Sequence, residues 1–165
     1  MLKKLIILLF IIAPIGIYAQ DKIAYINSQE IFFQMPEIKD VEAKITAKQE
    51  EIKKTLATME GEYASLQEKF RADTESLTPS LIADRQKQME QIQDRYETYA
   101  QNSQRELQEL SQQLQAPLLE KLQKTIQTVG QEQGYTYIIE KTAVPFVSSS
   151  AIDAGNLVKA KLGIK

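Results

Sequence analysis

Two long stripes of apolar residues at helical spacing occupy the middle of the chain. The first advances mostly in steps of three, four and seven residues, which is the repeat of a two-helix coiled-coil seam. Its members are Ile38, Val41, Ile45, Ile52, Leu56, Met59, Tyr63, Leu66, Phe70 and Leu77. The second stripe consists of Ile82, Met89, Ile92, Tyr96, Tyr99, Leu107, Leu110, Leu114, Leu118, Leu122, Ile126 and Val129. Forty residues of helix span about 60 Å, so the pattern predicts rods rather than the helices of a compact core.

The break between the stripes predicts a helical hairpin. Thr78 is a good N-cap for a helix whose first residue is Pro79, and Gly134 is typical of the position just past a helix end. Folding the chain there pairs positions whose numbers sum to about 158, in an antiparallel coiled coil. We expect this arm to span residues 37–133, with its tip near residues 78–80.

Polar residues interrupt both stripes at the same height. Lys48 and Thr55 take seam positions on the first helix, and Ser103 and Glu106 weaken the second. Because few apolar contacts hold the helices together there, we expect a soft joint in the middle of the arm.

Pro117 lies inside the second predicted helix. It lacks an amide proton and crowds the carbonyl of Gln113, so a kink is expected. Two interpretations stay open: the proline is a tolerated irregularity, or it sets the angle at which the arm leaves the rest of the protein.

The flanking segments predict a small β-rich body. Lys22–Ile26 is a short strand, followed by Asn27 and Glu30 as a capping box that opens one helical turn. After the arm, Tyr135–Ile139 alternates as a strand does, and Phe146–Val147 begins another.

A closing helix is expected after these strands. Asp153 can cap it, Leu157, Val158 and Leu162 form its apolar face, and it ends near Gly163.

The body, residues 20–36 and 134–165, is too small to supply a self-sufficient core. We therefore expect several copies to join their strands in one body, which removes exposed sheet edges and leaves the arms around a shared space. The residues expected in the core of that oligomer are Ile23, Tyr25, Ile138 and Val147.

The first nineteen residues are typical of a cleavable signal peptide. Lys3 and Lys4 precede an apolar run, and Ala19 ends the segment with the small residue that a signal peptidase accepts. The alternative is an uncleaved anchor, but the apolar stretch is shorter than the roughly 20 residues that cross a bilayer, and Pro14 breaks it. We expect export to the periplasm, with no stable membrane insertion afterwards.

Composition argues against catalysis. The 165 residues include no His, no Cys and no Trp, which excludes disulfides, thiolate or imidazole metal sites and every nucleophile–His pair. Ser148, Ser149 and Ser150 have no base nearby in sequence, and the glycines form no phosphate-binding loop. We expect no enzyme activity, no catalytic residue, no cofactor and no metal.

The balance of charge also argues against nucleic acid as a partner. The chain has 20 Lys and Arg against 22 Asp and Glu, and removal of Lys3 and Lys4 with the signal would leave 18 against 22, a net charge of −4. Binding to phosphates favours a concentrated basic surface instead.

Three segments together resemble the periplasmic chaperone family called Skp or OmpH. Residues 22–37 are similar to the family's opening strand, short helix and proline, and residues 117–135 to the end of its second long helix. Tyr137–Glu140, Val144–Phe146 and Asp153 with the closing helix are similar to its final part. The three segments occur in the family's order and spacing across the whole mature chain.

The resemblance implies a mostly α, α+β homotrimer with a small β-rich trimerisation body and three coiled-coil arms. It also implies a holdase that keeps unfolded outer-membrane proteins in the cavity between the arms without ATP. This chain departs from the family's basic members, because residues 37–133 carry 13 basic and 18 acidic side chains. A basic lipopolysaccharide-binding cluster found in some members has no counterpart here.

The candidate contacts with such clients are large side chains of the two stripes: Tyr63, Phe70, Met89, Tyr96 and Tyr99. The competing interpretation, which helical spacing favours, is that all five belong to the seam and nothing more. At the level of function, the rival is a structural or adaptor protein of the cell envelope that uses the hairpin as a spacer.

Overall fold

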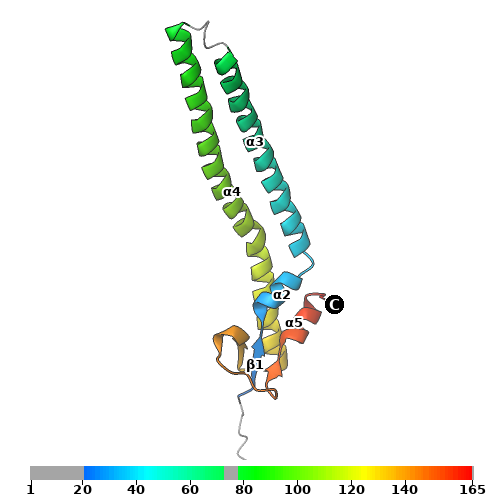
Figure 1. Cartoon of the computed structure of the whole chain (residues 1–165). Coiled ribbons are helices and arrows are strands. Elements are labelled where there is room, and N and C mark those ends of the chain that lie inside the picture. Colours follow the sequence, from blue (N-terminus) through cyan, green and yellow to red (C-terminus); the bar gives the residue numbers. More distant parts are fainter. Residues whose placement is uncertain (1–20, 73–77, 165) are drawn as a thin grey trace, which may run out of the picture.

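The computed structural model describes residues 21–72 and 78–164 as a long helical arm on a small base (Figure 1). The protein is mostly α with a small β part, as the sequence predicts. The expected signal peptide, residues 1–19, and Leu77 of the first stripe lie outside the described residues.

The arm is an antiparallel helical hairpin. Its helices are α3 (Ile38–Ala72) and α4 (Pro79–Gln133), which lie side by side over the length of the arm (Figure 1). The predicted ends of α4 are confirmed: the Thr78 hydroxyl accepts a hydrogen bond from the Leu81 amide at 3.4 Å, and Gly134 adopts the left-handed conformation with φ 63°. Any residue other than glycine would have a strained backbone at that φ, so the helix ends at the position where the sequence has a glycine.

Pro117 interrupts no part of this helix. α4 continues as one helix from Pro79 to Gln133 around it, and the proline ring is exposed. The kink expected there stays a prediction.

The base contains a three-stranded sheet in which every pairing is parallel. β1 (Ile23–Ile26) is central, between β2 (Tyr137–Glu140) and β3 (Ile152–Asp153). Ile23 pairs with Tyr137 and Ala24 with Ile152, so the start of the described chain is held between two segments that follow the arm.

The strand predicted at Phe146–Val147 is wrong. β2 passes into a 3₁₀ turn (η1, Lys141–Ala143), and residues 144–151 contain no strand. Pro145 has no amide to donate to a ladder, and a turn closed by the Ala151 amide on the Ser148 carbonyl at 3.0 Å delays the third strand until Ile152. Phe146 consequently projects from a loop with 81% of its surface exposed.

Two short helices complete the base. α2 (Ser28–Gln34) begins with the predicted capping box, in which Asn27 Oδ1 accepts from the Glu30 amide at 3.1 Å and Asn27 Nδ2 donates to the Glu30 carboxylate at 3.3 Å. α5 (Gly155–Lys161) begins two residues after Asp153, whose carboxylate accepts from the Gly155 amide at 2.7 Å. Asp153 therefore does bond the start of this helix, although Ala154 occupies the cap position.

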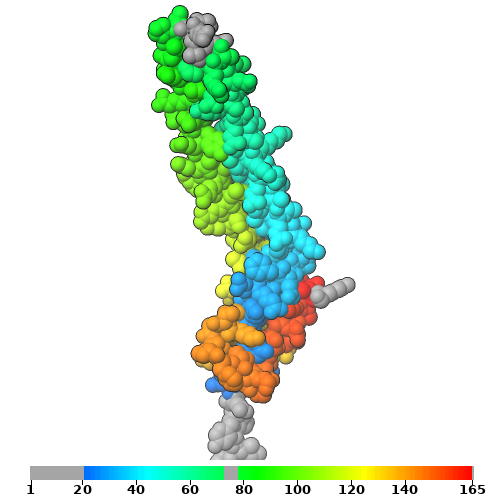
Figure 2. Space-filling view, in the orientation of Figure 1, coloured from blue at the N-terminus to red at the C-terminus, as the bar shows by residue number. Residues whose placement is uncertain are grey.

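The core of the base includes the lower turns of α4. Its buried members come from β1, α2, the start of α3, α4 and α5: Ile26, Ile31, Phe32, Met35, Ile38, Leu122, Val129, Val158 and Leu162. Leu122 and Val129 belong to the arm helix by sequence, yet they pack in the base. The space-filling view shows arm and base as one continuous body (Figure 2).

Candidate functional site

The two arm helices are joined by polar contacts as well as by the apolar seam. Arg95 donates to the Glu62 carboxylate at 3.1 Å, and the Lys48 ammonium lies 3.0 Å from the Glu106 carboxylate. Nearer the base, Lys121 donates to the Glu37 carboxylate, which lowers the pKa of Glu37. The numbers in these pairs sum to 157, 154 and 158, close to the register that the two stripes predict.

A hollow opens beside the seam in the upper half of the arm. We call it the tyrosine groove; it has a volume of about 200 Å³. Its lining residues are Met59, Glu60, Tyr63, Ile92, Gln93 and Tyr96. The Tyr96 hydroxyl donates to the Glu60 carboxylate at 3.1 Å, and this hydrogen bond raises the pKa of Tyr96. The contact fixes the Tyr96 ring as one wall of the groove.

The structure brings together two of the five candidate client contacts. Tyr63 and Tyr96 both line the tyrosine groove, from α3 and α4 respectively. Phe70, Met89 and Tyr99 lie elsewhere along the same pair of helices and are also half-buried. None of the five is fully buried in this chain, so each keeps part of its surface exposed, and their contact with a client stays a prediction.

The polar interruption of the seam is built around a buried hydroxyl. Ser103 is 2% exposed, and its Oγ has no hydrogen-bond partner. The Lys48 side chain, 21% exposed, bonds Glu106 across the helices and Glu51 on its own helix, and the Glu106 contact is the main cause that raises the pKa of Lys48. The Thr55 hydroxyl donates a hydrogen bond to the Glu51 backbone carbonyl at 3.1 Å, within its own helix. Lys48 and Glu106 therefore meet across the two helices within the polar interruption, and the soft joint expected there stays a prediction.

The four residues expected in an oligomer core lie in different surroundings. Ile23 is 46% exposed, whereas Ile138 is half-buried against the core of its own protomer. Tyr25 and Val147 are half-buried, and the Lys141 ammonium lies 5.8 Å from the centre of the Tyr25 ring. Only Ile23 among them presents a largely free apolar side chain.

Sequence reasoning missed several exposed apolar side chains of the base. They are Phe33, Tyr137, Phe146, Ile152 and Leu157. Phe33, 61% exposed, lines a hollow where arm and base meet, together with Met35, Pro36 and Ile164. The signal was weak for Phe33 and Leu157, because each stands beside an apolar residue that does enter the core, Phe32 and Val158 respectively, and only packing decides which of two neighbours is left outside.

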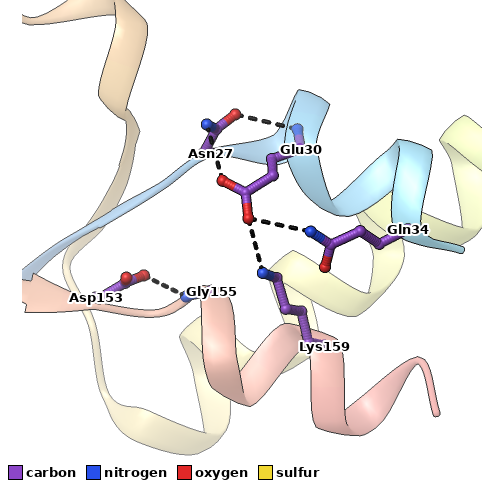
Figure 3. Close-up of polar contacts among 6 residues, drawn as sticks. All are labelled: Asn27, Glu30, Gln34, Asp153, Gly155 and Lys159. Carbon is purple, nitrogen blue, oxygen red and sulfur yellow. Dashed lines mark hydrogen bonds and ion pairs between the residues drawn. The ribbon is translucent and has the colours of Figure 1, made fainter. Parts of the chain in front are cut away.

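A polar cluster fastens the two short helices of the base to each other (Figure 3). The Glu30 carboxylate accepts from Lys159 of α5 at 2.9 Å and from Gln34 at 3.2 Å. The hydrogen bond from Lys159 is the main cause that lowers the pKa of Glu30. Each charged group drawn has its partner within the cluster, an arrangement typical of a structural clamp rather than of a reactive site.

Two further properties of the described chain bear on function. Residues 21–72 and 78–164 contain no helix both long and apolar enough to cross a membrane. The same ranges contain no group of three or more His, Cys, Asp or Glu side chains arranged to hold a metal ion.

Comparison with known proteins gives consistent results. The sequence profile of the family described as outer membrane protein (OmpH-like) matches residues 22–162. The chain is similar to the chaperone protein Skp of Pectobacterium atrosepticum, with 22% identity over 151 residues that cover 92% of each chain. It is also similar in structure to an outer membrane chaperone (OmpH-like) from Caulobacter crescentus, with a TM-score of 0.78 and 17% identity over 87% of this chain and 85% of that one. At that identity the structural match shows a shared fold.

Proposed function

Because this chain belongs to the OmpH-like family, we propose that it is a periplasmic holdase chaperone that keeps unfolded outer-membrane proteins soluble without ATP. The observation that carries the proposal is the arm itself. It is a long exposed hairpin in which several aromatic and apolar side chains, Tyr63 and Tyr96 among them, are only partly buried between its own two helices.

A holdase needs many weak and adaptable contacts rather than one deep pocket. An unfolded chain held by several low-affinity contacts in a confined space stays bound through effective concentration, and it leaves when a stronger binding partner is present. Shallow hollows along the arm and at its junction with the base, near Phe33, suit this mode of binding. Binding of this kind requires neither a metal nor a cofactor.

The confined space requires more than one copy, and we propose a homotrimer. The base of one chain leaves apolar side chains such as Ile23, Tyr137 and Phe146 exposed, and its sheet ends on short edge strands. Exposed apolar patches and unpaired edges both favour association with further copies. Arms that leave a shared base would then enclose the client between them.

A solubility assay tests the proposal. A denatured outer-membrane β-barrel protein is diluted out of urea, and light scattering is followed with the mature chain added in trimer-stoichiometric amount, with and without ATP. We expect scattering to be suppressed equally in both cases. Aggregation at the rate of the client alone would contradict the proposal and favour the adaptor function.

A further inference from the structure

The tyrosine groove has the size of a binding site for one large apolar side chain. Its volume is about 200 Å³, and Met59, Tyr63, Ile92 and Tyr96 supply apolar and aromatic walls from both arm helices. An apolar cavity of about 150 Å³ in a protein is large enough to bind benzene. An aromatic ring from another polypeptide therefore fits this hollow.

The surroundings of the groove are strongly acidic. The two helix stretches that border it, residues 57–66 and 89–99, carry a single cation, Arg95. They also carry five carboxylates: Glu60, Glu62, Glu90, Asp94 and Glu97. Three of these belong to the groove side and form its rim: Glu60 lines the groove, and Glu90 and Glu97 lie three residues before and four residues after the lining residue Gln93, on the same helix face. Asp94 lines a different hollow of the arm, together with Arg95. The one guanidinium is already paired with Glu62 at 3.1 Å.

The remaining carboxylates keep their charge available. Glu60 accepts a hydrogen bond from the neutral Tyr96 hydroxyl, and Glu90 and Glu97 have no cationic partner in the described part of the arm. A partner that binds here meets apolar walls inside a negatively charged rim.

We propose that the tyrosine groove binds client segments in which an aromatic side chain is flanked by Lys or Arg. The inference rests on the proposed holdase function and adds the chemical class of segment that this arm prefers. The aromatic ring fills the groove while the flanking cations face the carboxylates of the rim. Acidic segments are disfavoured, because like charges repel at such an interface.

Fluorescence provides a direct probe of the groove. The chain has no tryptophan, so Tyr63→Trp introduces a unique fluorophore into its wall. The mature variant is titrated with short peptides that alternate Phe with Lys, Phe with Glu, or Ala with Lys. Only the Phe–Lys peptide is expected to shift the tryptophan emission of this variant at low peptide concentration, whereas Tyr137→Trp in the base serves as a control reporter.

Affinity is measured separately on the unaltered chain, by anisotropy of labelled peptides. Because each exposed ion pair contributes a factor of about 1.5 to 5, three rim carboxylates predict a preference of roughly tenfold for Phe–Lys over Phe–Glu. The preference should shrink at high ionic strength, which screens exposed charges.

A matched pair of triple variants locates the effect. Glu60→Gln, Glu90→Gln and Glu97→Gln together should reduce the preference to less than about twofold, and Gln at position 60 keeps an acceptor for the Tyr96 hydroxyl. The control removes the same net charge from exposed carboxylates elsewhere on the arm, by Glu42→Gln, Glu50→Gln and Glu109→Gln, and should retain most of the preference.

The outcomes separate this inference from the proposed function. Equal affinity for the two Phe peptides, or equal effects of the two triple variants, would overturn the inference even if the unaltered chain still suppresses client aggregation. If the tryptophan emission of the Tyr63→Trp variant changes without peptide as the native mass rises above that of the proposed trimer, a further copy occupies the groove, and that result would also overturn the inference. Failure to suppress aggregation, with the peptide preference intact, would count against the holdase function instead.

Discussion

At the scale of single residues, the buried hydroxyl of Ser103 lowers the stability of the middle of the arm. A buried hydroxyl that has lost its water and gained no partner costs free energy. Alanine removes the hydroxyl, leaves the helix backbone unchanged and has a higher helix propensity. We therefore expect Ser103→Ala to raise the free energy of unfolding by about 1 kcal/mol, measured by urea denaturation at fixed protein concentration.

The matched control lies on the same helix. Ser111 is half-buried, and its Oγ accepts from the side-chain amide of Gln115 at 2.8 Å, so Ser111→Ala removes a satisfied group and should give no comparable gain. Equal gains from both variants would mean that helix propensity alone, rather than the orphaned hydroxyl, is responsible.

The Glu30–Lys159 contact predicts a dependence of stability on pH. The pKa of Glu30 is lowered below its ordinary value of 4.5, so the stabilisation is complete above that value and is lost as the pH falls through the folded-state pKa. We expect the unfolding midpoint of Glu30→Gln to lie below that of the unaltered chain at about pH 7, and the difference to shrink as the pH falls below 4.5 and through the folded-state pKa. Thermal unfolding followed by circular dichroism across this range measures it.

Other carboxylates with lowered pKa, Glu37 and Glu120, are present in both proteins and cancel in the comparison. A difference that stays constant down to low pH would show that Glu30 acts through packing or helix capping, without a contribution from its charge.

At the scale of elements, the long helix α4 contains one unfavourable position. Proline inside a helix removes one hydrogen bond and crowds the preceding turn, at a cost of about 3 kcal/mol relative to alanine. Pro117 is exposed and has 38 helical residues before it and 16 after it in α4. We expect Pro117→Ala to raise the free energy of unfolding by about 1 to 3 kcal/mol, measured by denaturant unfolding.

The same helix provides the control. Pro79 is its first residue, where the missing amide proton has no partner in any case, so Pro79→Ala should change stability by less than about 0.5 kcal/mol. If Pro117→Ala gives no gain in stability, the surrounding helix has already adapted to the ring, and the expectation of a kink loses its energetic basis.

At the scale of the whole molecule, the exposed apolar side chains of the base predict association. Ile23 is the clearest probe, because it is 46% exposed and an aspartate there would bury a charge only if copies join. We expect Ile23→Asp to reduce the native mass from that of the proposed trimer towards that of a monomer in multi-angle light scattering.

Two comparisons make that measurement specific. Ile138 is a poorer probe, since it packs against the core of its own protomer and its replacement would unfold the base. Leu81, similarly exposed but near the tip of the arm, gives the control: Leu81→Asp should keep the native mass of the unaltered chain. A folded Ile23→Asp variant with unchanged mass would remove Ile23 from the subunit interface.

The local elements of this protein follow from the sequence because their signals are local. Asn27 with Glu30, Thr78 with Pro79, and Gly134 each fix a helix end through contacts within a few residues, and all three form as predicted. The strand predicted at Phe146–Val147 failed for the complementary reason. A short β-prone run becomes a strand only if another strand is within reach, and here β3 takes the place beside β1.

The candidate site was predictable only in part. Helical spacing placed Tyr63 and Tyr96 on the facing sides of the two arm helices, but it did not distinguish a seam contact from a groove wall. That distinction depends on the distance between side chains of the two helices, which is set only when the helices pack together. The exposure of Phe33, beside the buried Phe32, was decided in the same way.

The sequence by itself determined the two rods and their register, because the period of a helix converts spacing directly into direction, and it determined the start of the second rod at Pro79 through the local cap of Thr78. Tertiary structure alone decided that β1 lies between β2 and β3 in a parallel sheet and that Leu122 and Val129 of the arm complete the core of the base. The strand pairings join residues more than a hundred positions apart, and only the hairpin, by returning the chain to its starting point, brings them together.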